Sequence, residues 1–202
     1  MSSCLSNTEN ILLDKEGHIR LADFGFARDD IKDGILTYTF CGSPEYLSPE
    51  MIQRCGHSKS TDMWSFGCLL FELLYGEPPF RDSNYALLYQ KIRGGCPPLP
   101  SQLSPDAQDL IQQCLAIEED KRPTASVAMQ HPFFAEIDWS KIRSKDVSPP
   151  MRPAVFSPID TSNFDIGFTS IAPEPISPLH KKGSKTASRF RHSFVDTEFE
   201  DF

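Results

Sequence analysis

Residues 61–80 read TDMWSFGCLLFELLYGEPPF, and this stretch decides the fold. Apolar side chains occupy nearly every helical face between Met63 and Tyr75, which is the pattern of a helix buried on all sides. Gly76 is the residue type that most often ends a helix, and Pro78 follows it because proline cannot continue one. The sequence therefore predicts a central helix around which the rest of a domain packs.

The segments on either side of this helix predict the remaining architecture. Upstream, ILLDKEGHIRLAD at 11–23 consists of two short apolar runs around a turn with Gly17, which indicates a β-hairpin. Downstream, SNYALLYQKIRGG at 83–95 is amphipathic and ends at a glycine pair, and SPDAQDLIQQCLA at 104–116 begins with Ser104 as N-cap. One hairpin followed by a run of helices predicts an α+β fold that is mostly α, rather than a sandwich or a Rossmann sheet.

Composition excludes several classes of function. The 202 residues carry a net charge of −8, which argues against general binding to nucleic acid. No apolar run approaches the roughly 18 residues of a membrane span, and no signal peptide is recognisable. The six cysteines form no C-x-x-C pair, which is typical of reduced thiols. We expect a cytoplasmic protein that can also be nuclear, with no nucleic-acid partner and no membrane span.

Proline marks a change of organisation near residue 142. Seven of the 17 prolines lie beyond it, in SPPMRPAVFSPIDTSNFD and APEPISPL. No helix can run through prolines at that spacing, so this part is predicted to be extended or unstructured. We expect a divergent N-terminus at 1–9, a partial domain at 10–142 and a long tail at 143–202.

Four blocks stand in one order along the chain: ENILLD at 9–14, DFG at 23–25, CGSPEYLSPE at 41–50, and DMWSFGCLLFELLYGEPPF at 62–80. Together they resemble the C-terminal lobe of a serine/threonine protein kinase. The TFCGSPEY loop and the DTSNFD segment of the tail make the chain similar to the AGC group, near the cAMP-dependent and ribosomal-protein kinases. The resemblance is close from residue 9 to about 166.

The resemblance implies a nucleotide and metal site. Its members use ATP with Mg²⁺, because transfer of a γ-phosphoryl group spreads negative charge that the cations offset. Magnesium prefers oxygen ligands, and Asn10 and Asp23 match the family's amide and carboxylate ligands. Phe164 matches a tail aromatic that reaches the adenine site. The alternative is that Asn10 and Asp23 are ordinary turn residues.

The stretch CLSNTEN at 4–10 departs from the family's pattern. Aligned on Asn10, the catalytic aspartate falls on Leu5, and a phosphate-contacting lysine falls on Asn7. Leucine cannot accept a proton, and loss of a general base typically costs roughly 10²–10⁴ in rate. No Gly-rich loop or lysine-bearing strand precedes these residues, so we expect a truncated chain that is inactive alone. Three hypotheses stay open: a piece of an active kinase, a non-catalytic regulator of substrates or upstream kinases, and a chain that does not fold stably.

Further residues match the family's substrate groove. Glu9 and Glu72 match two glutamates that pair with an arginine two residues before the target serine, and such pairing is strong and directional. Ser43 matches a residue that places the substrate hydroxyl. The apolar pocket for the residue after the target is matched by Phe40, Pro44 and Leu47. The alternative for Glu72 is a plain charge on a helix face.

The remaining matches concern regulation and stability. Thr39 and Ser177 correspond to phosphorylation sites of the loop and the tail. Glu50 is expected to pair with Arg122. Asp62, at the head of the central helix, matches an acceptor of catalytic-loop hydrogen bonds.

The last four residues, FEDF, are similar to the family's hydrophobic motif. Phe199 and Phe202 are three residues apart, so one helical turn would place both rings on one face. The resemblance implies that they bind the upstream phosphoinositide-dependent kinase. The alternative is that this end of the chain is disordered and has no partner.

Overall fold

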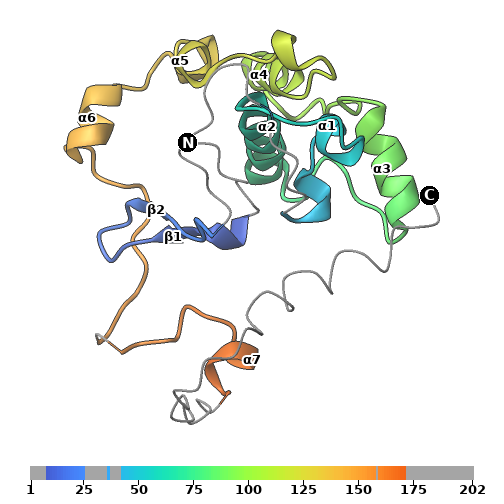
Figure 1. Ribbon diagram of the computed structural model, residues 1–202. Helices are drawn as coiled ribbons and strands as arrows, with labels where there is room; N and C mark the ends of the chain where they lie inside the picture. The colour runs from blue at the N-terminus through green and yellow to red at the C-terminus, as the bar shows by residue number, and fades with distance from the viewer. Residues whose placement is uncertain (1–7, 26–35, 37–41, 158, 172–202) are drawn as a thin grey trace, which may run out of the picture. The chain divides into compact units, whose positions relative to one another are not determined.

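The computed structural model of the protein describes residues 8–25, 36, 42–157 and 159–171. The chain divides into two compact units, residues 1–156 and residues 157–202. The first unit contains the hairpin and the helices up to α6, and the second contains the short helix α7 (Ile166–Thr169) (Figure 1).

The hairpin predicted around Gly17 is confirmed. A 3-10 turn, η1 (Thr8–Asn10), leads into β1 (Ile11–Leu13), which pairs antiparallel with β2 (Ile19–Leu21). Gly17 has a φ of 92°, a left-handed conformation that glycine adopts without steric cost. The hairpin brings the residues before β1 and after β2 to one end of the sheet.

The central helix α2 (Ser60–Tyr75) ends where the sequence predicts. The N–H of Gly76, at a φ of 93°, donates to the carbonyl of Glu72 at 2.7 Å. Trp64 and Cys68 on this helix are completely buried. The burial of α2 is incomplete in its last turn, where Leu73 is 62% exposed. Composition predicts that a helix is apolar, but it does not say which neighbours cover each face.

The helices after α2 begin at polar caps. In α3 (Tyr85–Arg93), the Asn84 side chain accepts from the N–H of Ala86 at 2.8 Å. In α4 (Pro105–Cys114), the Ser104 hydroxyl accepts from the N–H of Ala107 at 3.2 Å. Both helices were predicted, and the caps satisfy amide groups that have no partner inside the helix.

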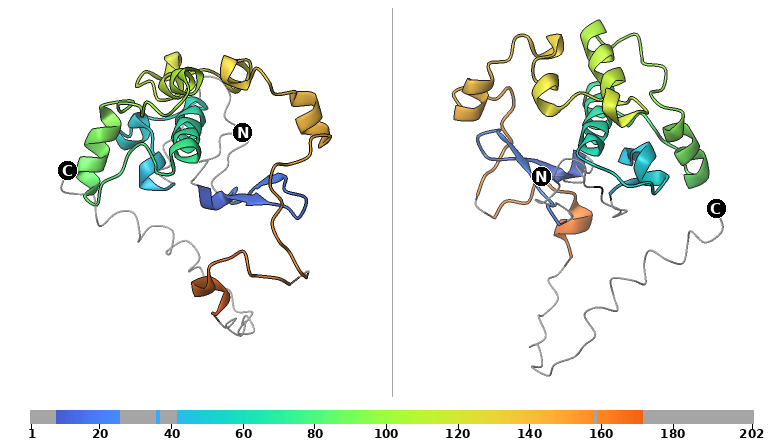
Figure 2. Two further views of the ribbon diagram at one scale, coloured as in Figure 1. Left: turned by 180° about the vertical axis from the view of Figure 1, so that it is seen from behind. Right: turned by 45° about the horizontal axis from the view of Figure 1, so that its top comes forward.

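Close packing of α2 against α4 forms the core of the first unit. In each view α2 lies between the hairpin and α3 (Figures 1 and 2). At Gly67 a Cβ atom would lie only 2.7 Å from the Cβ of Cys114 and 3.0 Å from Leu115. The absence of a side chain at Gly67 therefore sets the spacing of the two helices.

Short elements complete the first unit. On one side of α2 are η2 (Pro44–Tyr46) and α1 (Pro49–Ile52). After α4 the chain continues through η3 (Glu119–Lys121), α5 (Ala125–Ala128), η4 (Pro132–Phe134) and α6 (Trp139–Ser144). The Trp139 ring packs edge-on against Phe134 at 5.2 Å, and its Nε1 donates to the carbonyl of Met129 at 2.9 Å.

The segment after α6 returns to the hairpin turn. Lys145 Nζ donates to Asp14 Oδ2 at 3.3 Å, and the backbone N–H of His18 donates to Asp14 Oδ1 at 2.9 Å. These contacts, led by the His18 amide, lower the pKa of Asp14 to about 2. A Cβ on Gly17 would lie 2.1 Å from the carbonyl oxygen of Met151. We call these contacts the clasp.

The fold is α+β and mostly α, as the sequence predicts, with one two-stranded antiparallel sheet among the described residues. None of the helices in the described part of the chain has the length and hydropathy to span a bilayer.

Candidate active site

The two candidate metal ligands lie at the same end of the hairpin. Ile11 pairs with Leu21, so Asn10 precedes one strand at the point where Ala22 and Asp23 leave the other. The N–H of Ala22 donates to the Asn10 carbonyl at 2.8 Å, which extends the pairing by one step. The register therefore places Asn10 and Asp23 on adjacent backbones at one end of the hairpin.

Asp23 has an unusual backbone conformation. Its φ is 58°, in the left-handed region, where aspartate and asparagine occur more often than other residues with a side chain. Its Oδ1 accepts from the N–H of Gly25 at 3.3 Å. Such conformations concentrate at functional sites, where the surrounding structure holds them in place.

The donor set at this end suits a hard cation. Magnesium is commonly held by one or two protein ligands plus substrate phosphates, and oxygen atoms are its preferred donors. The described residues contain no group of three or more His, Cys, Asp or Glu side chains that could hold a metal without help. Asn10 and Asp23 therefore fit a magnesium ion that arrives with a phosphate ligand.

Glu72 is held by two hydroxyl groups. The Tyr46 hydroxyl, from η2, donates to its Oε2, and Thr8 Oγ1, from η1, donates to its Oε1 at 3.5 Å. Thr8 is two residues from Asn10, so this contact connects α2 to the metal end of the hairpin. The carboxylate is thereby fixed in one orientation.

The surroundings of Glu72 are negatively charged. Partial burial raises the pKa of Glu72, and the nearby charges of Glu45 and Glu9 raise it further, while the Thr8 hydrogen bond acts in the opposite direction. A raised pKa means that the ionised carboxylate lacks a compensating positive charge. The three carboxylates form an environment that favours a cationic side chain.

The candidate pocket for the residue after the target is partly described. Ser43 is the N-cap of η2 and Pro44 its first residue. Leu47, directly after η2, is only 2% exposed. Phe40, the third predicted member of this pocket, and Thr39, the predicted phosphorylation site, lie outside the described residues.

Glu50 and Arg122 form a buried bidentate ion pair. Arg122 donates from one terminal nitrogen to Glu50 Oε1 at 2.7 Å and from the other to Oε2 at 2.8 Å. The Arg122 side chain is fully buried, and Glu50 is 5% exposed. The pair joins α1 to the segment after η3, 72 residues further along the chain.

Further contacts satisfy this pair. Thr61 Oγ1 donates to Glu50 Oε1 at 2.8 Å, and Arg122 Nε donates to the carbonyl of Ala116 at 2.8 Å. The guanidinium carbon lies 5.0 Å from the centre of the Trp64 ring. Burial alone would raise the pKa of Glu50, but the hydrogen bonds and charge of Arg122 outweigh it and lower that pKa.

The other predicted site residues are dispersed. Asp62 lies in the first turn of α2. Phe164 belongs to the second unit, where it is 59% exposed and its N–H donates to the Thr161 carbonyl at 2.9 Å. Besides Thr39 and Phe40, the predicted residues that lie outside the described part of the chain are Leu5, Ser177, Phe199 and Phe202.

Sequence reasoning missed the partners of two carboxylates. The hydroxyls of Tyr46 and Thr8 hold Glu72, and the hydroxyl of Thr61 holds Glu50. No spacing rule relates these residues to their partners, since the pairs with Glu72 span 26 and 64 positions. The available signal was that a carboxylate on an apolar helix requires a polar neighbour.

Residues 7–134 match the family model described as "Protein kinase domain". The chain is 44% identical over 168 residues to serine/threonine-protein kinase gad8 of Schizosaccharomyces pombe, covering 82% of this chain and 30% of that protein. It is 41% identical over 170 residues to ribosomal protein S6 kinase beta of Caenorhabditis elegans, covering 82% and 31%. It is 37% identical over 198 residues to protein kinase C delta type of Mus musculus, covering 96% and 29%.

These matches place the chain in the protein kinase family. The chain belongs to the AGC group of serine/threonine protein kinases. It spans about a third of the length of these curated relatives. Kinases of this family use ATP and Mg²⁺ and act on protein substrates.

Proposed function

We propose that this chain forms the substrate-binding lobe of an ATP-dependent serine/threonine kinase that prefers basic peptides. The observation that carries the proposal is the hydrogen bond from Thr8 to Glu72. It connects the negatively charged surroundings of Glu72 with the hairpin end that bears Asn10 and Asp23. A phosphate donor at the hairpin and a cationic substrate side chain at Glu72 would then be neighbours.

At the metal end, Asn10 and Asp23 would hold magnesium through an amide oxygen and a carboxylate. When bound with ATP, the metal neutralises charge on the phosphate oxygens. Phe164 would contact the adenine ring. The hairpin register supports this assignment, because Asn10 precedes β1 at the end of the sheet where Asp23 follows β2.

At the acidic end, Glu72 and Glu9 would bind an arginine two residues before the target serine or threonine. A guanidinium group donates in a planar fork that matches carboxylate oxygens. The Tyr46 and Thr8 hydroxyls hold Glu72 in place, so less side-chain freedom is lost on binding. Ser43 would place the target hydroxyl, and Phe40, Pro44 and Leu47 would contact the residue that follows.

Leu5 implies that this chain transfers no phosphate by itself. It stands where the resemblance requires an aspartate, and a leucine side chain cannot orient or deprotonate a hydroxyl. A non-catalytic regulator is therefore the second candidate. The buried Glu50–Arg122 pair is compatible with either candidate, because it joins α1 to the segment after η3 and takes no part in catalysis.

The regulatory sites complete the proposal. Phosphate on Thr39 or Ser177 adds roughly −1.5 to −2 charge and needs basic partners. Phe199 and Phe202 would bind the upstream phosphoinositide-dependent kinase. We place the protein in the cytoplasm, with access to the nucleus.

The test uses two labelled peptides that differ at one position. One has arginine two residues before the serine, and the other has citrulline, which keeps the shape but not the charge. We expect the arginine peptide to bind at least about tenfold more tightly, a difference of about 1.4 kcal/mol. Glu72→Gln should abolish the difference, while Glu77→Gln, at an exposed carboxylate paired with Arg81, should preserve it.

The same samples test the consequence of Leu5. Incubation with labelled ATP and Mg²⁺ should give no transfer to the arginine peptide, because a leucine side chain cannot act as the base. Transfer that Asp23→Ala abolishes would contradict this expectation. Equal binding of the two peptides would contradict the proposed preference for basic substrates.

A further inference from the structure

The sequence contains six serine–proline pairs, and the structure describes both residues of four of them. A serine N-cap followed by proline is a common way to begin a helix. Three of the four pairs have this role: Ser43 in η2, Ser48 in α1 and Ser104 in α4. The fourth pair, Ser148–Pro149, begins no helix, because residues 146–156 contain neither helix nor strand. Helix capping therefore does not explain this pair.

Ser148 is also accessible in a way that the other three serines are not. Ser48 is completely buried, and Ser43 is partly buried. Ser104 is exposed, but its hydroxyl caps α4 by accepting from the N–H of Ala107 at 3.2 Å. Ser148 is exposed, and a residue before proline favours an extended backbone. Of the four described pairs, only this one can enter the cleft of an enzyme without the unfolding of a helix.

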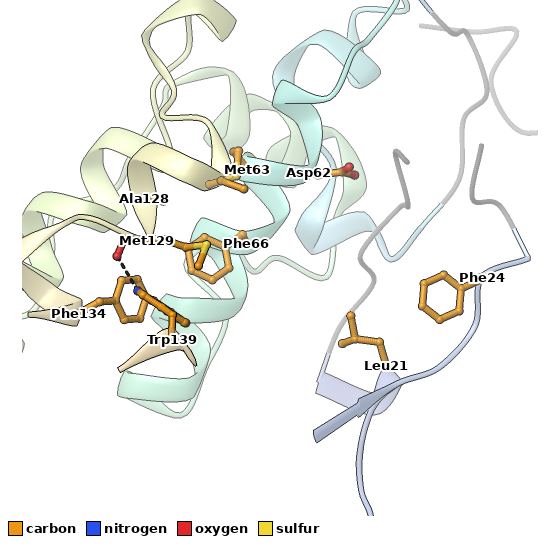
Figure 3. A pocket seen from close by; sticks show the side chains of 10 residues that line it. Leu21, Phe24, Asp62, Met63, Phe66, Ala128, Met129, Phe134 and Trp139 are labelled. Atoms are coloured by element: carbon orange, nitrogen blue, oxygen red, sulfur yellow. Dashed lines mark hydrogen bonds between the residues drawn. The ribbon is translucent and has the colours of Figure 1, made fainter. Parts of the chain in front are cut away.

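The helix before Ser148 is anchored to the first unit. Trp139, the first residue of α6, packs edge-on against Phe134 with 5.2 Å between the ring centres. Its Nε1 donates to the carbonyl of Met129 at 2.9 Å (Figure 3). α6 ends at Ser144, four residues before Ser148. The segment that carries Ser148 therefore starts from a fixed point.

Contacts of the clasp lie on both sides of Ser148 in the chain. Three residues before it, Lys145 Nζ donates to Asp14 Oδ2 at 3.3 Å. One residue after it, the Cβ of Pro149 lies 2.9 Å from the position that a Cβ on Gly17 would occupy. Asp14 and Gly17 belong to one turn, since the N–H of Gly17 donates to the Asp14 carbonyl at 2.8 Å. A group attached to Ser148 would therefore lie at the hairpin turn.

We propose that a separate kinase that selects serine followed by proline phosphorylates Ser148, and that the phosphate loosens the clasp. Proline has no backbone N–H and a fixed φ, which such an enzyme can recognise. Ser148 Oγ forms a bond to the γ-phosphorus of ATP on the second enzyme, and the bond between that phosphorus and the β,γ-bridging oxygen breaks. ADP leaves with the electron pair of that bond, and the hydroxyl proton passes to the base of the second enzyme.

The charge of the phosphate acts against the clasp. It adds roughly −1.5 to −2 charge and binds lysine and arginine side chains. Lys145, whose side chain is 46% exposed, is therefore a partner for which the phosphate competes with Asp14. Arg20 Nε donates to Asp14 Oδ2 at 3.3 Å from within the hairpin, so Asp14 keeps a cation there when Lys145 leaves. The added negative charge also repels the Asp14 carboxylate.

The modification would act on the element that bears the candidate metal ligands, because Asn10 and Asp23 lie at the other end of the same hairpin. The inference goes beyond the proposed function, since the chain is here the substrate of a second enzyme. Ser148 is also distinct from Thr39 and Ser177, the two sites that the family resemblance implies.

The first measurement tests the choice of site. The full chain, with Ser157→Ala and Ser177→Ala to remove the other two pairs, is incubated with ATP, Mg²⁺ and a purified mitogen-activated protein kinase. Mass spectrometry gives the rate at each remaining serine–proline pair, and four short peptides with the same pairs serve as unfolded controls. In the folded chain we expect Ser148 to react at least about tenfold faster than Ser48 or Ser104, which must first open locally. The peptides should differ by less.

The second measurement tests the effect on the clasp. Hydrogen exchange is compared before and after phosphorylation, with Ser148→Ala treated in the same way as the control. Amides of residues 14–18 should exchange about twofold to fivefold faster with the phosphate, the size expected for loss of an exposed ion pair, and those of α4 should not change. Lys145→Gln removes the same pair without a phosphate, so phosphorylation of this variant should accelerate exchange less.

Two kinds of result would overturn the proposal. The first is reaction at Ser48 or Ser104 as fast as at Ser148 in the folded chain, or reaction of Ser148 in its peptide and not in the chain. The second is unchanged or slower exchange at residues 14–18 after phosphorylation of Ser148, which would show that the phosphate does not loosen the clasp.

Discussion

Replacing Arg122 with methionine should reveal how strongly the buried ion pair stabilises the lobe. Methionine keeps much of the volume but removes both charged hydrogen bonds to Glu50, at 2.7 and 2.8 Å. It also removes the hydrogen bond to the Ala116 carbonyl and the guanidinium contact with Trp64. Glu50, at 5% exposure, would then be a buried ionised carboxylate that keeps the hydrogen bond from Thr61 but has lost its cationic partner.

The expected loss is about 3–5 kcal/mol of the free energy of unfolding at pH 7, since breaking a buried pair strands one charge. Glu50→Gln together with Arg122→Met should recover part of that loss, because no charge remains to be buried. Arg81→Met is the matched control. Arg81 pairs with Glu77 at 3.7 Å on the surface, so its loss should cost about 0–1 kcal/mol.

The pH dependence gives a sharper test. In the wild type the pKa of Glu50 is below 4.5, so its contribution to stability is present above that pH and is lost as the pH falls through the folded-state pKa. In Arg122→Met, burial without the arginine should raise this pKa above 4.5. Protonation then relieves the stranded charge, so the difference in stability between the two proteins should shrink as the pH falls from 7 to 5.

The assay is urea unfolding followed by tryptophan fluorescence, because Trp64 is completely buried beside Arg122. The urea concentrations at the unfolding midpoint are compared at pH 7 and pH 5. Sucrose, which stabilises folded proteins, is added to every sample if the variant is only marginally stable. A loss of less than about 1 kcal/mol in the free energy of unfolding at pH 7 would refute the reasoning, because a surface ion pair contributes that much. A difference that grows on acidification would refute it as well.

Three further predictions rest on single positions. Gly67→Ala should lower the free energy of unfolding by about 1–3 kcal/mol, because the new Cβ would lie 2.7 Å from the Cβ of Cys114. An unchanged midpoint in urea unfolding would contradict the close packing of α2 on α4. Gly17→Val should displace the segment around Met151, because the added Cβ would lie 2.1 Å from the Met151 carbonyl oxygen. Hydrogen exchange should then become faster in that segment and stay unchanged in α4. The pKa of Glu72 is raised, so Glu72 should begin to be protonated, and the arginine peptide should bind less tightly, as the pH falls toward 5. An affinity that does not change between pH 7 and pH 5 would argue against Glu72 as the binding carboxylate.

The local sequence pattern was sufficient to predict the turns and helix ends that are determined by residues close together in the chain. The turn at Gly17, the end of α2 at Gly76 and the cap at Ser104 each depend on backbone geometry that neighbouring residues specify. The pattern of α2 by itself does not show which of its faces is covered, because an apolar helix has the same sequence whether or not a neighbour lies beside it. Whether a neighbour covers a face of the helix depends on the tertiary structure and not on the sequence of the helix itself.

The candidate site was predictable only through resemblance to a family. Glu50 and Arg122 are 72 residues apart, and no periodicity connects them. The resemblance supplied the carboxylate at Glu72 but not the hydroxyls of Tyr46 and Thr8 that orient it. Those contacts depend on how η1 and η2 approach α2, which is decided by packing.

The clasp between the hairpin turn and the segment after α6 has a mechanical consequence. Asp14 and Lys145 are 131 residues apart, yet their side chains are 3.3 Å apart, and Met151 lies against Gly17. A pulling force applied to the chain at the end of the first unit, residue 156, therefore reaches the hairpin turn before it reaches α2 or α4. Tension on the tail would load the element that carries Asn10 and Asp23 and leave the helical core unloaded until the clasp opens.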